Sequence, residues 1–361
     1  MLTPPLARNL EASVRDLEST RPSTRVSSIA DLVRHAQGDA AVRTRAIPLL
    51  EKALSSDAAA EVRSAAAVAL GDLAASEALS ALLVAVEDAD LHVRQMALNA
   101  LGEIGDVRAL PRLRRALSDA RPEVRYQGII AFCRVAQEEE DALEALEKAT
   151  SDEDAAVRYI ALRIAEERID TAAKHLPPPS CDGTRSERAA SWMKLGPRAR
   201  EMLHDPARQV RVVAAIFLAK AGDDTGHEII ERVVRGQLRA DKEDEREAVE
   251  IAGELGLRDL VPQLERRAWG AQTWLGLRDT CAFHAKIALA RMDHPRARAE
   301  IARDLRAAKR ETRSAAVVAA GRARLVDLRE TIAAMPDDAV EPELRADALQ
   351  RLQRGPYSVK A

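Results

Sequence analysis

The chain has 361 residues, 47% of them hydrophobic and 31% charged, and its 55 basic and 58 acidic residues leave a formal charge of -3. The length and apolar content exclude a disordered chain, and the balance of charge gives no reason to expect nucleic acid or an anionic membrane as partner. Only 2% of residues are aromatic. The core must therefore consist of Ala, Leu, Val and Ile, which fill the space between close helices well, so composition predicts an all-α protein.

The cysteines and apolar runs bear on the compartment. Cys133, Cys181 and Cys281 form no CxxC motif and have no histidine at zinc-ligand spacing. Met1 to Glu18 lacks a basic region followed by an apolar run, and no stretch approaches the roughly 18 consecutive apolar residues of a membrane span. We expect a cytoplasmic protein that binds no metal and no cofactor.

A helical pattern begins near Thr24 and recurs along the chain. Counting the first residue of each copy as offset 0, apolar residues recur at offsets 0, 4, 7, 8 and 11, which form one face of a helix. We name this predicted helix the B helix. Its copies start at Thr24, Val62, Val93, Val124, Val157, Val210, Glu245, Cys281, Thr312 and Leu344.

Each B helix is preceded by a second amphipathic run, which we name the A helix. Such runs cover residues 77–87, 107–117 and 142–150, and short acidic turns such as Asp88 to Asp90 join them to the B helices. We expect these acidic residues to cap the B helices. Offset 4 holds Ala, Ser or Gly in nine of ten copies. This predicts that the next helix packs closely against it.

The repeated stretches Asp90 to Arg108 and Asp119 to Val135 resemble HEAT repeats, in particular the short bacterial kind known as PBS-lyase HEAT-like repeats. The resemblance covers Thr24 to Leu352 and is strongest between Val62 and Ala165. It implies an armadillo-like, right-handed α-solenoid, a superhelix of about ten HEAT-like helix pairs. It implies little about function, because such repeats serve scaffolds, adaptors, bilin-attaching enzymes and DNA glycosylases.

The regular spacing breaks once, between the copies at Val157 and Val210. The extra length contains Pro177-Pro178-Pro179 and ends at Gly196-Pro197, which predicts a stiff loop followed by an additional or broken helix. We therefore expect N-terminal repeats over residues 1–176, a Pro-rich insertion over 177–197, and C-terminal repeats over 198–361 that continue the first array. The insertion could be a surface excursion without a role.

A second departure is a local enrichment of aromatic residues. Trp269, Trp274 and Phe283 lie within 15 residues of each other in a chain with nine aromatic residues. They either fill the core where the repeat pattern fails or form an exposed patch for a partner. The sequence leaves both interpretations open.

The B helices are expected to line the inner face of the solenoid, and offset 2 lies just beside the buried stripe. It holds Tyr126 and Tyr159 in adjacent copies. We expect these rings to form a contact platform for a partner, although packing between repeats is an alternative. The predicted partner-binding residues are Met96, Tyr126, Gln127, Tyr159, Ile160, Trp269 and Trp274.

Offset 1 is arginine in nine of ten copies. A phosphate-binding stripe is one interpretation. A structural ladder is the simpler one, because each turn offers an Asp or Glu that suits the planar guanidinium. The ladder is predicted for Arg63, Arg94, Arg125, Arg158 and Arg211.

No catalytic motif is present in the sequence. We therefore expect a non-catalytic scaffold or adaptor that binds a protein or peptide along its inner face. A nucleic-acid-binding solenoid is the alternative, because residues 296–313 carry seven basic against three acidic residues. A DNA glycosylase using Trp269, Trp274 and Asp279, or a bilin lyase, is a further alternative.

Overall fold

The computed structural model describes the backbone of residues 9–174, 192–270 and 281–353, and the side chains of the first range up to residue 169. The chain divides into two compact units, Met1–Ile164 and Ala165–Ala361, here called unit 1 and unit 2. The division falls inside helix α10. The insertion predicted at 177–197 lies largely outside the described residues, so its boundaries stay a prediction.

Every regular element in the described residues is a helix, and the predicted all-α solenoid of ten helix pairs is confirmed. Nine of the ten B helices contain their predicted copy start, and the tenth start, Cys281, is the N-cap residue of α18. The pairs, A helix before B helix, are α1 (Leu10–Asp16) with α2 (Pro22–Gly38), α3 (Ala40–Ser56) with α4 (Ala60–Asp72), α5 (Leu79–Ala85) with α6 (Leu91–Ile104), α7 (Leu110–Ala116) with α8 (Pro122–Val135), α9 (Glu139–Ala149) with α10 (Ala155–Lys174), α12 (Gly196–Met202) with α13 (Arg208–Lys220), α14 (His227–Val234) with α15 (Lys242–Glu254), α16 (Val261–Trp269) with α18 (Ala282–Arg291), α19 (Pro295–Asp304) with α20 (Arg310–Ala323), and α21 (Arg329–Ala333) with α22 (Pro342–Leu352).

Several A helices are entered through a single 3-10 turn. The turns are η1 (Ser76–Ala78), η2 (Val107–Ala109), η3 (Met193–Leu195), η4 (Arg258–Leu260) and η5 (Val326–Leu328). Each turn is followed directly by its α-helix, so the chain reverses after a B helix with a minimum of irregular backbone.

Acidic turn residues cap the B helices α6, α10 and α15, as predicted, whereas α2, α4, α8, α13, α18, α20 and α22 have no side-chain cap. The Asp90 carboxylate accepts hydrogen bonds from the backbone N–H groups of His92 and Val93, at 2.9 and 3.1 Å. Asp154 caps α10 in the same way. These bonds satisfy N–H groups that have no partner inside the helix, and the negative charge suits the helix dipole.

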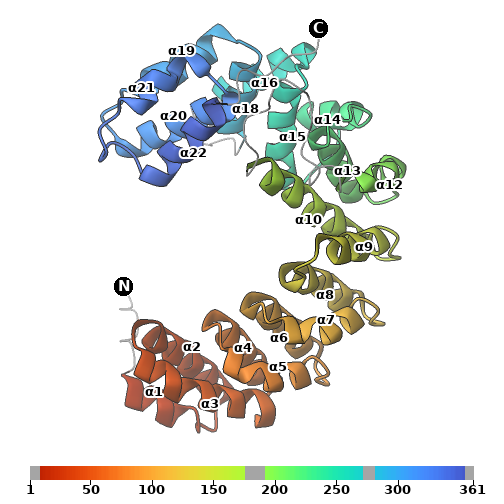
Figure 1. Ribbon diagram of the computed structural model, residues 1–361, viewed down its shortest axis with the longest axis vertical. Helices are drawn as coiled ribbons and strands as arrows, with labels where there is room; N and C mark the ends of the chain where they lie inside the picture. The colour runs from red at the N-terminus through yellow and green to blue at the C-terminus, as the bar shows by residue number, and fades with distance from the viewer. Residues whose placement is uncertain (1–8, 175–191, 271–280, 354–361) are drawn as a thin grey trace. The chain divides into compact units, whose positions relative to one another are not determined.

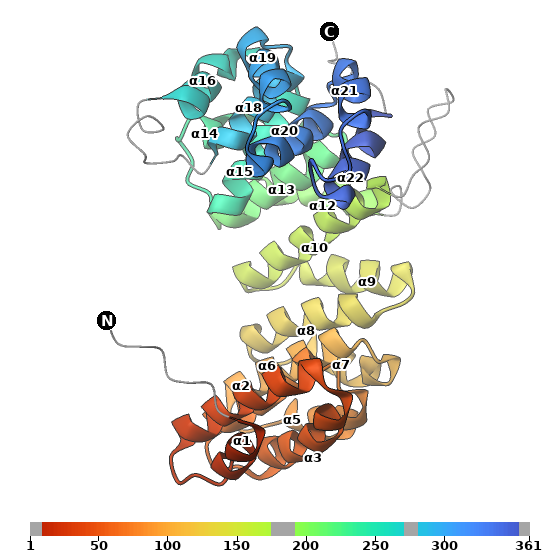
Figure 2. The same ribbon diagram turned by 90° about the vertical axis from the view of Figure 1, so that its left-hand side faces the viewer.

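In unit 1 the B helices form one layer and the A helices the other (Figure 1). Neighbouring B helices approach closely where a glycine faces an alanine of the next repeat. A Cβ added at Gly71 would lie 3.0 Å from Cα of Ala100, and one at Gly102 would lie 3.0 Å from Cα of Ala131. The side-by-side stacking of α6 and α8 is visible in Figure 2. Glycine is therefore required at these positions by the close approach of two backbones.

The small residue at offset 4 has a different role from the one predicted at Gly128. An added Cβ there would meet Ala116 of helix α7 at 3.0 Å, so this residue packs against the A helix of its own pair. At Ala348 the offset-4 residue does face the preceding B helix, because Gly321 lies against it. Small residues thus close both kinds of interface in the array.

Each unit has its own hydrophobic core. The core of unit 1 runs from Ile29 to Val135, and the core of unit 2 runs from Val212 to Leu352. No helix in the described parts of the chain combines the length and hydrophobicity needed to cross a membrane.

Candidate partner-binding surface

One stripe of positions on the B helices of unit 1 faces outward from the B layer. On each of α4, α6 and α8 the stripe has four residues at i, i+4, i+7 and i+11, which lie along one face of a helix. The two end positions are exposed and the two middle positions are half-buried on all three helices. The stripes are Glu61, Ala65, Val68 and Asp72; His92, Met96, Asn99 and Glu103; and Glu123, Gln127, Ile130 and Arg134.

We name the middle residues of these stripes, together with Ile160 of α10, the inner strip. It consists of Ala65, Val68, Met96, Asn99, Gln127, Ile130 and Ile160. None of these side chains is charged, although 31% of the chain is. The strip offers methionine and branched aliphatic side chains beside amides, a mixture typical of protein interfaces. Gln127 Nε2 donates to Asn99 Oδ1 at 3.3 Å, so the two amides are linked across neighbouring helices.

The two tyrosines predicted to bind a partner flank this strip. Tyr126 and Tyr159 lie on consecutive B helices, and both side chains are half-buried. Burial raises the pKa of the Tyr126 phenol, so the ring presents a neutral hydroxyl. The structure therefore places Met96, Tyr126, Gln127, Tyr159 and Ile160 on one face of unit 1.

The equivalent positions on the first three B helices of unit 2 are buried. Val212, Val213 and Ile216 of α13 are fully buried, as are Ala248 of α15 and Ile287 of α18. On α20 the equivalent residues are accessible, since Ala315 is exposed and Val318 is half-buried. In unit 1 the accessible stripe continues over the three consecutive helices α4, α6 and α8.

Unit 2 instead contains a buried ionic network centred on Glu250 of α15. Its Oε1 lies 2.7 Å from Nδ1 of His284 and 3.1 Å from Nη2 of Arg322, and its Oε2 lies 3.3 Å from Nη2 of Arg291. Arg291 Nη1 also donates to the backbone carbonyl of Glu250 at 2.8 Å. Burial opposes ionisation of Glu250, but the His284 hydrogen bond and the charges of Arg291 and Arg322 outweigh it and lower its pKa. The network joins α15, α18 and α20.

Trp269, the other predicted contact residue, lies in a polar cluster of unit 2. Its indole N–H donates to Glu300 at 3.0 Å, and the Arg296 guanidinium lies 4.1 Å from its ring centroid. The ring is half-buried and packs against the unit 2 core. Trp269 thus joins α16 to α19. Trp274 and Asp279 lie outside the described residues.

The arginines at offset 1 form the bonds of a ladder. Arg63 donates to both carboxylate oxygens of Asp88 at 2.8 Å, and Arg125 donates to both oxygens of Asp152 at 2.8 and 2.7 Å. Each also bonds a backbone carbonyl of its own turn, as Arg63 does with Asp57 at 3.0 Å. Arg158 and Arg211 bond the carbonyls of Asp152 and Asp205. Arg63 and Arg125 thus join successive repeats, as the ladder predicts, whereas these bonds of Arg158 and Arg211 lie within the turn of their own repeat. All four guanidinium groups are engaged within the protein, which disfavours a phosphate-binding stripe.

The ladder is interrupted at Arg94. Its Nη1 donates to the carbonyl of Asp88 at 2.8 Å, but its Nε is buried without a hydrogen-bond partner. Asp119, which occupies the position of Asp88 in the following turn, forms no ion pair with Arg94. The rung between these two residues is therefore missing.

The ladder carboxylates are held ionised. The pKa of Asp88 is lowered by the hydrogen bonds from Arg63, which outweigh the effect of burial. For Asp57 and Asp152 burial is the larger single influence and raises the pKa, but the arginine and backbone hydrogen bonds together lower it. Folding therefore favours the charged form of these three groups.

The basic run 296–313 is largely neutralised within unit 2. Arg298 pairs with Asp293 and Asp327, and Arg310 pairs with Glu341. Arg296 and Arg303 pair with acids of their own helix, and Arg313 donates to backbone carbonyls. Few of its charges are left to bind phosphate groups.

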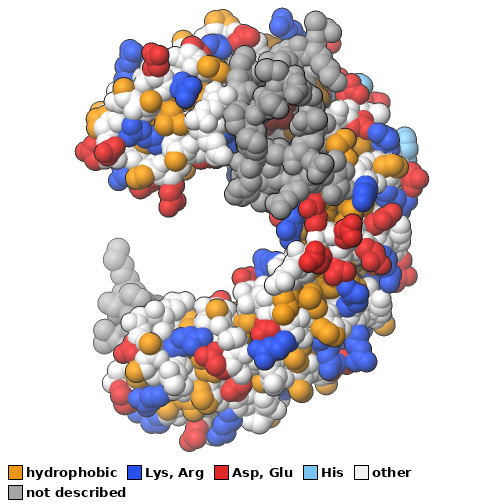
Figure 3. Space-filling model, in the orientation of Figure 1, with side chains coloured by type: hydrophobic (Ala, Val, Ile, Leu, Met, Phe, Trp, Pro, Cys, Tyr) orange, Lys and Arg blue, Asp and Glu red, His pale blue; other side chains and the backbone are white. Residues whose placement is uncertain are grey.

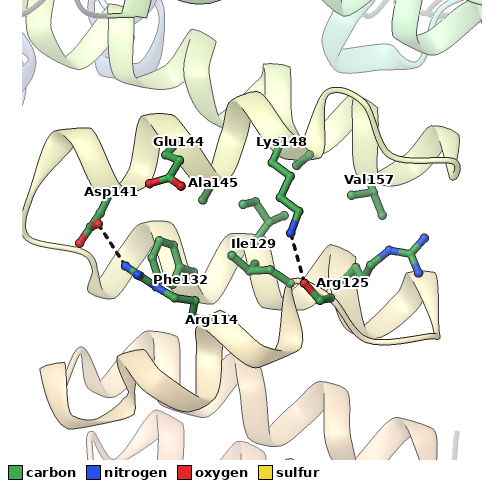
Figure 4. A pocket seen from close by; sticks show the side chains of 12 residues that line it. Arg114, Arg125, Ile129, Phe132, Asp141, Glu144, Ala145, Lys148 and Val157 are labelled. Atoms are coloured by element: carbon green, nitrogen blue, oxygen red, sulfur yellow. Dashed lines mark hydrogen bonds and ion pairs between the residues drawn. The ribbon is translucent and has the colours of Figure 1, made fainter.

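The clefts in the described residues lie beside the A helices. The one shown in Figure 4 has a volume of about 200 Å³ between α7 and α9, with Ile129 and Phe132 among its apolar lining. Across this cleft, Nη2 of Arg114 lies 3.0 Å from Oδ1 of Asp141, and Nζ of Lys148 donates to Oγ of Ser118 at 3.4 Å. Similar clefts of about 310 and 600 Å³ separate α1 from α3 and α19 from α21. They recur because neighbouring A helices diverge while the B helices stay close.

The remaining candidates for a chemical site in the described part of the chain are metal-ligand clusters and cysteines. No group of three or more His, Cys, Asp or Glu side chains could hold a metal ion there. Cys133 and Cys281 are buried. On the face of unit 1 shown in Figure 3, apolar, acidic and basic side chains are interspersed.

Comparison with known proteins supports the repeat assignment. Residues 47–133 match the family model of HEAT repeats, so this stretch carries HEAT repeats, as its sequence pattern predicts. No curated protein matches the sequence. The described architecture is that of a HEAT-repeat α-solenoid.

Two similar solved structures illustrate the fold. YibA of Escherichia coli shares 18% identity over 79% of this chain and 93% of its own, with a TM-score of 0.51. The CpcE–CpcF complex of phycocyanin lyase from Nostoc shares 19% identity over 78% of this chain and 97% of that chain, with a TM-score of 0.43. The likeness to YibA, at 18% identity, concerns the fold alone.

Proposed function

We propose that this protein is a non-catalytic scaffold or adaptor that binds a protein or peptide partner on the B face of unit 1. The observation that carries the proposal is the inner strip with its flanking tyrosines. It is an uncharged, half-buried and chemically mixed surface that continues over consecutive helices. Tyrosine rings contribute large contact area at low entropic cost, methionine adapts its flexible side chain to the partner, and the amides add hydrogen bonds.

The same observations disfavour a nucleic-acid partner on this face. Binding to a phosphate backbone requires unpaired arginine or lysine side chains, because the gain comes from releasing counterions. The strip has none, and the ladder arginines beside it are bonded within the protein. We expect the purified protein to pass through a DNA column at physiological salt.

The test is affinity capture from native lysate with wild-type protein and the double variant Tyr126→Ala/Tyr159→Ala, followed by binding of the purified partner. We expect the double variant to lose at least tenfold in affinity, because interface tyrosines often dominate binding. Val84→Ala/Val107→Ala is the matched control. Both valines are exposed, at 73% and 42% of their surface, and lie on the A side of unit 1.

Thermal unfolding of both variants checks that unit 1 remains folded. A partner that binds the tyrosine variant and the valine variant equally well would show that binding does not use this face.

A further inference from the structure

The charges around the inner strip indicate what kind of partner fits it. Unit 1 carries 20 basic and 26 acidic residues, a formal charge of -6, whereas the whole chain has -3. The ladder aspartates do not account for this surplus of acidic residues, because each of them already has an arginine or backbone N–H groups as partner. Part of it lies at the ends of the stripes.

The arginines within α2, α4, α6 and α8 are all engaged. Arg34 pairs with Asp31 and Arg134 pairs with Glu103. Arg94 donates to a backbone carbonyl. The remaining arginines of these helices bond the turn aspartates, and they are Arg25, Arg63 and Arg125.

Among the residues that the structure describes, three carboxylates of the same helices have no side-chain hydrogen bond or ion pair. Glu61 and Asp72 lie at the two ends of the α4 stripe, and Glu123 lies at the start of the α8 stripe. All three are exposed. The inner strip is therefore an uncharged surface with exposed carboxylates on both sides. Of these, Glu61 lies near enough to Arg25 to help raise the pKa of that arginine. We name these three residues the acidic rim.

We propose that the inner strip binds an extended peptide segment in which uncharged residues alternate with lysine or arginine. This inference rests on the proposed function and adds the chemistry of the partner. Uncharged side chains of the segment pack on Met96, Ile130 and the tyrosines. Its basic side chains reach the acidic rim, where opposite charges speed association and set specificity.

The dimensions suit this arrangement. Packed helices are about 8–10 Å apart, and an extended chain advances about 3.3 Å per residue, so each helix spacing takes about three residues. Glu61 and Asp72 are eleven positions apart, or about 16 Å at 1.5 Å per residue. A segment along the middle of the strip therefore runs about 8 Å from either rim, which a four-carbon lysine stem with its ammonium approaches.

The experiment uses three fluorescein-labelled nine-residue peptides of Val and Ser, with Lys, Gln or Glu at every third position, and measures binding to the full chain by fluorescence anisotropy. We expect the Lys peptide to bind at least tenfold more tightly than the Glu peptide, with the Gln peptide between them. The preference should weaken as salt screens the exposed charges.

The rim variant is Glu61→Gln/Asp72→Asn/Glu123→Gln. We expect it to weaken binding of the Lys peptide by about fivefold to tenfold, as three exposed charge pairs would. The matched control is Glu11→Gln/Glu144→Gln/Glu147→Gln, which removes three exposed carboxylates from the A helices of unit 1 and changes the net charge equally. It should alter binding by less than twofold.

Equal binding of the Lys and Glu peptides, equal effects of the two triple variants, or no binding of any peptide would overturn the inference. The variant Tyr126→Ala/Tyr159→Ala distinguishes failure of this inference from failure of the proposed function. If the variant weakens binding of the Lys and Glu peptides equally while charge has no effect, the proposed binding face is supported and only the proposed chemistry of the partner is wrong.

Discussion

Arg63 and Asp88 form a two-pronged ion pair between consecutive helix pairs, with Nε and Nη2 each 2.8 Å from a different carboxylate oxygen. The pair is mostly buried, with side-chain exposures of 17% and 14%. The carbonyl of Asp88 in turn accepts a bond from Arg94. One turn residue thus connects two successive B helices, α4 and α6.

Removing an arginine that pairs with an aspartate of the next repeat should cost more stability than removing one that bonds only carbonyl groups. We expect Arg63→Ala to lower the free energy of unfolding by about 2–3 kcal/mol, because it leaves a partly buried carboxylate without its charged hydrogen bonds. Arg94→Ala should cost about 1 kcal/mol, since it loses only bonds to carbonyl groups. Urea denaturation followed by circular dichroism measures both. Equal losses would show that the carboxylate contacts contribute little.

The ladder should make unit 1 sensitive to acid. Because folding lowers the pKa of Asp57, Asp88 and Asp152, the stability that they contribute is fully present above the ordinary aspartate pKa of about 4. It is lost as the pH falls through their lower folded values. We expect the melting temperature to fall steeply below pH 4, and Asp88→Asn to flatten this dependence. An unchanged acid profile in Asp88→Asn would contradict the assignment.

The close approach of the B helices predicts an asymmetric response to added methyl groups. Gly102→Ala should destabilise the protein by about 1–3 kcal/mol, because the new Cβ lies 3.0 Å from the Ala131 backbone. Gly38→Ala is the control. It has no atom within 4 Å of the added Cβ, so we expect it to be neutral or to stabilise by about 0.5 kcal/mol. Chemical denaturation of both variants decides this, and a neutral Gly102→Ala would refute the close packing.

The Glu250 network should be essential to unit 2. We expect Glu250→Ala to cost about 3–5 kcal/mol, since it leaves Arg291 buried without its central counter-charge. Glu254→Gln removes a more exposed partner of Arg291, 3.1 Å away, and should cost less than 1 kcal/mol. Unfolding measured by circular dichroism compares them. A mild effect of Glu250→Ala would show that the network is dispensable.

The fold was accessible from the sequence because the pattern repeats. The Val-Arg start, the small residue at offset 4 and the acidic turn recur often enough to place all ten B helices, including those of less regular copies such as Cys281 and Leu344. The Arg63 and Arg125 rungs follow from the same pattern, since each turn supplies an aspartate. The role of Gly71 and Gly102 was not evident from the sequence. The two glycines occupy the same offset in successive repeats, but the offset alone does not reveal which helix they face.

The site was less accessible. Glu250, His284 and Arg291 fall on positions that look like ordinary solvated charges in a helix, and only the convergence of α15, α18 and α20 buries them. The contrast between the accessible stripes of α4, α6 and α8 and the buried equivalent positions of α13, α15 and α18 depends on three-dimensional packing for the same reason. Tyr126 and Tyr159 were identifiable by their shared offset. The acidic rim was not, since an exposed glutamate gains meaning only when its possible partners are seen to be occupied.

The clefts beside the A helices have a mechanical consequence. When unit 1 flexes, the A helices can move together or apart at little cost, because loosely filled space separates α1 from α3 and α7 from α9. The B helices cannot move closer together, since Gly71 and Gly102 already bring backbones to contact distance. The B layer therefore resists compression, whereas the A layer can be compressed. Bending that closes the A side would leave the minimum spacing of contacts on the B face unchanged for a bound ligand.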